Sequence, residues 1–338
     1  MGDPAAHRFG LCLCPEPDHH FSPTTTIPLP MPRGAVTYNS LPAQIVGDQR
    51  CCCDKAKTMD TVVGGSATVT VGGRSAVPCS KVVTGHKGTV AIGATNVTIG
   101  GPLVIGPHAR FAKICPAMAA GRENKYLIGD REHGGLNKYT RYDQDDLTHQ
   151  NWNNCGQECV RMLVNEINHK NVSEWEMLRW SLENGHAAWE TDRAGNQKRG
   201  AVTPTERKGY IQAESDPPGN SNPSDWTAMA KQNDLETDTF GPNPGNQPVA
   251  ECLAESLRSG RPVMYSVELD FIPPLPGEQS GKGPHVVLVT GYEADENGNP
   301  VAFYVNDPMR GCAIRVEAAH LVRNRRAAAF VRPKAAAW

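Results

Sequence analysis

The stretch GPHVVLVTGYE (283–293) decides the fold of the C-terminal part of the chain. Its histidine, His285, is followed by apolar and β-branched residues, a pattern that predicts a strand over 285–293. The run AFYVND (302–307) predicts the next strand, and ENGN (296–299) predicts a hairpin turn between them. Counted from the centre of that hairpin, His285 and Asp307 lie abreast to within about three residues, so the Asp307 carboxylate can orient the imidazole.

Strands are also predicted at 262–269 and near 312–316, and helices come before them. Asn153 and Asn154 can cap a helix that begins at Cys155. Two further helices are predicted from a capping box at Ser173 and from the segment between Pro248 and Gly260, and residues 186–223 read as long surface loops. Helices followed by an antiparallel sheet indicate an α+β fold with helices packed on the sheet.

The run QNWNNCG (150–156) places Cys155 at a helix start, where backbone N–H groups and the helix dipole favour a thiolate. Gln150, upstream of it, can donate a side-chain N–H to an oxyanion. Gln157 or the backbone N–H of Cys155 could share that role. Cys159 lies one turn later on the same face of the helix and is the competing nucleophile.

Together these residues resemble the papain-like clan of cysteine peptidases, and most closely the bacteriocin-leader-processing peptidases, over roughly residues 148–332. The resemblance implies a cysteine endopeptidase that needs no cofactor for catalysis. It makes Cys155 the nucleophile, His285 the general base, Asp307 the orienting acid and Gln150 the oxyanion donor. The Gln-to-Cys gap is one residue shorter than is usual in those peptidases.

The N-terminal part contains a repeat. GSATVTVGG (65–73) and GATNVTIGG (93–101) are offset by 28 residues, and GAVTYNSLPAQIVGD (34–48) is a blurred third copy. Each clear copy reads as a strand that enters a tight Gly-Gly turn. Three such hairpins would form a small all-β cone with little core, which a structural metal could stabilise.

The run DTVVGGSATVTVGGR (60–74) and GHKG (85–88) make this part similar to PAAR domains over roughly residues 1–105. That resemblance implies a spike tip of type VI secretion machines that docks on the VgrG trimer and binds one structural zinc. His86 matches the ligand position best. The other three ligands come from a larger set of cysteines and histidines, of which we choose Cys79, His20 and Cys53. His19, Cys51, Cys52 and the Cys12/Cys14 pair remain alternatives.

Composition limits the possible classes of protein. The chain has 338 residues, enough for two domains, and its net charge of −2 does not favour a nucleic-acid partner. It shows neither a long apolar run nor a secretion signal, so we expect no stable membrane insertion. Without such a signal, metal ligation and a catalytic thiol explain the 11 cysteines better than a disulfide framework does.

We therefore expect a spike-tip domain at 1–115, a linker at 116–147 and a protease domain at 148–338. The fragment 148–338 is expected to remain active alone and without metal. The combination suggests a toxin that leaves the cytoplasm by type VI secretion and acts inside a competitor bacterium. A protein substrate and a cognate immunity protein would be its other partners. The alternatives are a deamidase or transglutaminase-like toxin that uses the same triad, and a non-catalytic spike adaptor.

Overall fold

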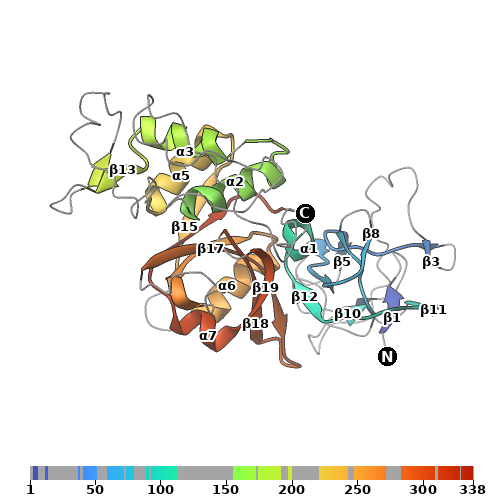
Figure 1. The fold of residues 1–338 in the computed structure, drawn as a ribbon. Coiled ribbons are helices and arrows are strands. Elements are labelled where there is room, and N and C mark those ends of the chain that lie inside the picture. The colour runs from blue at the N-terminus through green and yellow to red at the C-terminus, as the bar shows by residue number, and fades with distance from the viewer. Residues whose placement is uncertain are drawn as a thin grey trace, which may run out of the picture.

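The structure is a computed structural model of the 338-residue chain, shown as a ribbon in Figure 1. It describes residues 3–6, 12–13, 37–38, 41–51, 59–71, 74–79, 89–90, 93–112, 155–172, 174–191, 197–199, 221–242, 247–271, 283–308, 311–327 and 329–337.

The helices lie mainly in the C-terminal half. They are α1 (His108–Ala112), α2 (Cys155–Ile167), α3 (Glu174–Glu183), α5 (Pro223–Gln232), α6 (Val249–Arg258), the 3₁₀ turn η3 (Leu269–Phe271) and α7 (Ala318–Arg323). None of these described helices is long and apolar enough to span a membrane.

The N-terminal strands are short. They are β1 (Asp3–Ala6), β2 (Cys12–Leu13), β3 (Thr37–Tyr38), β4 (Leu41–Pro42), β5 (Gln49–Cys51), β6 (Met59–Thr61), β7 (Gly64–Ser66), β8 (Thr70–Val71), β9 (Arg74–Ser75), β10 (Thr89–Val90), β11 (Gly93–Ile99) and β12 (Leu103–Ile105). The later strands are β13 (Ala188–Thr191), β14 (Gln197–Arg199), β15 (Thr237–Phe240), β16 (Val263–Glu268), β17 (Pro284–Ala294), β18 (Pro300–Asp307), β19 (Gly311–Glu317) and β20 (Phe330–Pro333).

One eight-stranded antiparallel sheet organises the C-terminal part. Its strands follow the order β15-β20-β16-β17-β12-β7, with β18 paired to β17 and β19 paired to β18. The predicted α+β arrangement is confirmed for this region, and the four predicted strands are β16 to β19. The hairpin turn between β17 and β18 is closed by the Asp295 N–H, which donates to the Asn299 carbonyl at 2.9 Å.

Helices cover both faces of this sheet, with α2, α3 and α5 on one side and α6 and α7 on the other (Figure 1). Val286 and Leu288 of β17 pack in the cluster that contains α2, whereas Val287 and Val289 pack in the cluster that contains α6 and α7. A strand with two buried faces needs apolar side chains at consecutive positions. That requirement explains the unbroken VVLV run.

The helix predicted to begin at Cys155 is α2, and its Val160, Leu163 and Val164 are buried. Residues 186–223 were expected to form loops, but they contain the antiparallel strand pair β13–β14. It ends at α5, a helix that the sequence analysis did not predict. Asn222 caps α5, since its side chain accepts from the backbone N–H groups of Ser224 and Asp225.

The first Gly-Gly repeat forms the expected hairpin: β8 and β9 pair with Val71 opposite Arg74, on either side of Gly72-Gly73. The second repeat does not form a hairpin of its own. Its strand β11 pairs with β1, and β12, which follows the Gly-Gly pair, joins β7. A short strand without a local partner must find its hydrogen bonds elsewhere. The cone shape stays a prediction.

The two parts of the chain share the large sheet. β12 pairs with β7 on one side and with β17 on the other, through Ile105 and Tyr292. The predicted boundary at residue 115 assigns β12 and α1 to the spike tip, whereas both elements contact the C-terminal strands (Figure 1).

Candidate active site

The ends of three elements bring Cys155, His285 and Asp307 together. Cys155 is the first residue of α2, His285 the second of β17 and Asp307 the last of β18. Leu288 pairs with Asn306 in the register of β17 and β18, so His285 and Asp307 lie near the same end of the hairpin. Because β17 packs against α2, the His285 side chain lies near the start of that helix.

The His285 imidazole interacts with two side chains, those of Asp307 and Cys155. Its Nε2 lies 2.8 Å from Asp307 Oδ1, and the side chains of the two residues are 1% and 0% exposed. Cys155 also lies close enough to His285 to raise the pKa of the imidazole. The predicted order of acid, base and nucleophile is therefore present in the structure.

Electrostatics favour the imidazolium form of His285. Burial by itself lowers its pKa, but the charge and hydrogen bond of Asp307, with a smaller effect of Cys155, outweigh burial and raise the pKa to about 10. A raised pKa means that protonated His285 stabilises the fold fully below pH 6.5 and that this contribution is lost as the pH rises through about 10.

This arrangement can cleave an acyl bond. The Cys155 thiolate would add to a carbonyl carbon, and the His285 imidazolium would give its proton to the leaving amine. Water, deprotonated by the imidazole, would then hydrolyse the thioester, which releases the acid product and restores the Cys155 thiolate and the His285 imidazolium. Asp307 keeps the ring in the orientation and tautomer that both steps require.

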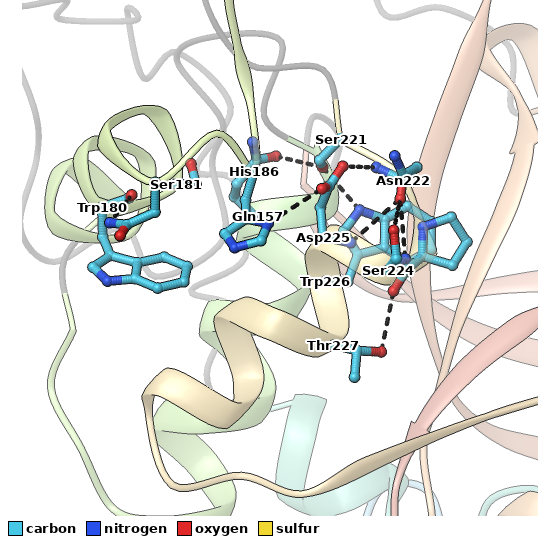
Figure 2. Close-up of polar contacts among 12 residues, drawn as sticks. Gln157, Trp180, Ser181, His186, Ser221, Asn222, Ser224, Asp225, Trp226 and Thr227 are labelled. Carbon is cyan, nitrogen blue, oxygen red and sulfur yellow. Dashed lines mark hydrogen bonds and ion pairs between the residues drawn. The ribbon is translucent and has the colours of Figure 1, made fainter. Parts of the chain in front are cut away.

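The start of α2 is fixed by packing against α5, as Figure 2 shows. The Trp226 indole N–H donates to Ser221 Oγ at 2.8 Å, and both groups lie against Gly156. A Cβ on Gly156 would overlap Trp226 Nε1 and lie 2.7 Å from Ser221 Oγ. Glycine after the nucleophile thus lets α5 approach the helix end that carries the thiol.

Gln157 also contacts Ser221, the residue that accepts the Trp226 hydrogen bond. Its Oε1 accepts from Ser221 Oγ at 3.1 Å, and its buried Nε2 has no hydrogen-bond partner among the described residues (Figure 2). A donor is therefore present near the nucleophile, and a role for Gln157 at the oxyanion stays a prediction. Gln150, the predicted oxyanion donor, lies outside the described residues.

Cys159 occupies a structural position. It is fully buried, and its Sγ donates to the Val286 carbonyl at 3.6 Å, which ties α2 to β17 beside His285. Burial, followed by the negative groups around it, raises the pKa of the Cys159 thiol well above its usual range. A thiol of that kind is a poor nucleophile, so the structure favours Cys155 over its competitor.

A buried ion pair inside α2 was not predicted from the sequence. Glu158 and Arg161 are fully buried, and Arg161 Nε donates to Glu158 Oε2 at 2.9 Å. Buried charges are tolerated only when paired and hydrogen-bonded. The i,i+3 spacing of an acid and a base was the available signal, but that spacing is far more common on exposed helix faces.

The predicted zinc ligands fall almost entirely outside the described residues, which contain no cluster able to hold a metal. His86, His20 and Cys53 lie outside them, and Cys79 is buried against Val46, Val62 and Val77. The zinc site stays a prediction. Cys312 in β19 is disulfide-bonded, a use of cysteine that the sequence favoured less than metal ligation and a catalytic thiol.

We expect Asp307→Asn to shift the alkaline limb of the pH–rate profile to lower pH. The amide cannot stabilise the imidazolium by charge, so the pKa of His285 falls, by about 1 to 3 pH units for a close charge pair. The measurement is hydrolysis of an activated phenyl ester from pH 5 to 11, with Asp238→Asn, remote in sequence and on β15, as the control. An unchanged alkaline limb in Asp307→Asn would contradict the assigned role.

A protein-family model matches much of the C-terminal part of the chain. Residues 136–324 match the model of the Peptidase_C39 like family, and this match spans more than half of the chain. Among solved structures, a C39-like peptidase from Bacillus anthracis is 16% identical, with a TM-score of 0.37; the match covers 54% of this chain and 88% of that one.

A double-glycine-motif protease of an AMS/PCAT transporter, solved with its leader peptide, is 15% identical, with a TM-score of 0.31; the match covers 55% of this chain and 89% of that one. No curated protein matches the chain. The family match includes Cys155, His285 and Asp307, and the C-terminal region has the α+β, papain-like fold of such peptidases. The chain belongs to the Peptidase_C39 like family and carries a cysteine protease domain.

Proposed function

We propose that the protein is a type VI secretion effector whose protease domain cleaves a protein of a competitor bacterium. The observation that carries the proposal is the buried His285–Asp307 pair beside Cys155, in a chain whose N-terminal repeats resemble a spike tip. A complete nucleophile, base and acid argue against a purely adaptor role.

The N-terminal part supports the delivery half of the proposal. The repeat strands 65–73 and 93–101 lie in the PAAR-like region, and the first repeat contains the β8–β9 hairpin. In this proposal the region docks on the VgrG spike trimer and binds structural zinc through His86, Cys79, His20 and Cys53. The toxin acts in the target-cell cytoplasm, and an immunity protein protects the producing strain.

A deamidase uses the same residues as a protease, because a thiolate can attack a glutamine side chain as well as a peptide bond. The two reactions leave different products. Proteolysis produces fragments of the substrate, whereas deamidation leaves its chain intact and about one dalton heavier, since an amide N–H₂ becomes a hydroxyl. We favour the protease because the chain belongs to a peptidase family.

We expect Cys155→Ala to abolish toxicity, with a loss of activity of about a thousandfold or more, because the covalent step needs the thiol. Cys159→Ala is the matched control: it removes a buried sulfur from the same helix and should keep most activity at a stability cost of about 1 kcal/mol. The test is competitive co-culture, with intact-mass analysis of target-cell proteins.

Fragments that appear with wild type and Cys159→Ala but not with Cys155→Ala would support the proposal. Mass gains of about one dalton without fragments would make the toxin a deamidase instead. Full toxicity of Cys155→Ala would overturn the assigned nucleophile. Equal toxicity of producers with and without VgrG would remove the delivery route while leaving the protease in place.

Elemental analysis of the full chain tests the zinc site. We expect one zinc per chain, lost in His86→Ala and retained in His169→Asn, an exposed position remote from the repeats. Chelation should impair delivery but leave ester hydrolysis by Cys155 intact, because the metal would be structural and catalysis uses a thiol. Wild-type protein without zinc would refute the predicted site.

A further inference from the structure

We propose that residues 103–112, which precede the family match, are an integral part of the catalytic domain, and that Asn306 is the positioning residue through which they hold Asp307 in place. The segment comprises β12 and α1. We refer to it as the brace. The proposal concerns the peptidase domain itself and does not depend on the route of delivery.

The first contact of the brace is with β17, the strand that carries His285. Ile105 pairs with Tyr292, and the backbones of the two strands approach closely at Gly291. A Cβ at Gly291 would lie 2.6 Å from Val104 Cγ1 and 2.8 Å from His108 Cβ. Real Cβ atoms do not tolerate such distances, so the close approach requires glycine at this position.

The second contact is polar and buried. His108 Nδ1 lies 3.2 Å from Thr290 Oγ1, and its ring packs against Tyr304 of β18 at 4.3 Å between centroids. Burial lowers the pKa of His108 to about 4, so the ring is neutral at physiological pH. A neutral ring can pack between the two catalytic strands without a counter-ion.

The third contact joins α1 to the far end of the catalytic helix. Arg110 Nε lies 2.6 Å from Glu166 Oε1 of α2, and a second guanidinium N–H donates to the Glu166 carbonyl at 2.6 Å. The remaining terminal nitrogen, Nη1, donates to the Ala337 carbonyl at 2.9 Å. Phe111 is fully buried in the cluster that contains Val160 and Leu163. The brace thus contacts α2 as well as the sheet.

Asn306 connects the brace to the acid. Its Nδ2 donates to the Phe111 carbonyl at 3.2 Å, and its Oδ1 accepts from the Ala313 N–H at 3.1 Å. The register of β18 and β19 shifts between Val305 and Asp307, so the Asn306 side chain supplies the hydrogen bond where the ladder is interrupted. Asp307 is the next residue, and its backbone position follows from that of Asn306.

The brace therefore touches β17, β18 and α2, the three elements that present His285, Asp307 and Cys155. A chain that begins at 148 lacks the Phe111 side chain and leaves the fully buried Asn306 amide without this acceptor. These contacts argue against the expectation that the fragment 148–338 is active alone. The N-terminal part instead contributes directly to the geometry of the active site.

Steric displacement of the brace tests the first half of the proposal. Gly291→Ala in the full chain should lower kcat for ester hydrolysis between about tenfold and 100-fold, as expected for a small misplacement of catalytic groups. Gly100→Ala is the matched control, because a Cβ there meets nothing within 4 Å. Equal activity of the two variants would overturn the proposal.

A second pair of variants applies if Gly291→Ala does not fold. Arg110→Ala removes the contacts to Glu166 and Ala337, whereas Arg179→Ala removes an exposed Arg–Glu pair on α3. We expect kcat to fall in Arg110→Ala and to stay unchanged in Arg179→Ala. The same kcat in both would contradict the role of the brace.

The pH profile tests Asn306 as a positioning residue. Asn306→Ala should lower kcat with little change in KM and move the alkaline limb to lower pH, since a loosened Asp307 stabilises the His285 imidazolium less. Asn306→Ser, which retains a hydrogen-bonding group, should restore part of this shift. A lower melting temperature with an unmoved alkaline limb would mean that Asn306 is only structural and would overturn its assignment.

Discussion

The buried pair of His285 and Asp307 is the interaction on which the active site depends. Removing an imidazolium and a carboxylate from water is costly, and their attraction offsets that cost only when the geometry is fixed. The fold fixes it by placing the two residues near the same end of adjacent strands of one hairpin and by covering both faces of that hairpin with helices. Cys155 lies near the imidazole, at the start of α2.

The sheet that holds this pair extends beyond the family match. Strand β17 pairs with β16, β18 and β12. Of these, β12 comes from residues that precede the family match. Phe111 and Arg110 extend this contact to α2. The N-terminal strands and the protease part are therefore joined through packed structure as well as through the chain between them.

Local patterns predicted the catalytic elements well. The VVLV run after His285, the turn at 296–299 and the helix start at Cys155 each depend on neighbours in sequence, and all are present in the structure. Helix α5 was missed although Asn222, Pro223 and Asp225 carry start signals, because the polar residues before it read as loop. The capping residues were the information needed to find it.

The remaining differences concern partners that are distant in sequence. Nothing local indicates that β12 pairs with β17, that Asn306 donates to Phe111, or that Glu158 and Arg161 are buried. Cys312 likewise gave no local sign of its disulfide. Such contacts depend on tertiary packing, which short-range periodicity does not encode.

Titration of the His285 ring by NMR would show whether Asp307 stabilises its imidazolium in the folded protein. In histidine-labelled protein, the resonance that is absent from His285→Asn identifies the ring. We expect this ring to stay protonated through neutral pH and to lose its proton near pH 10, because the adjacent Asp307 carboxylate stabilises the imidazolium. A His285 ring that titrates near its ordinary pKa of 6.5 in the folded protein would contradict it.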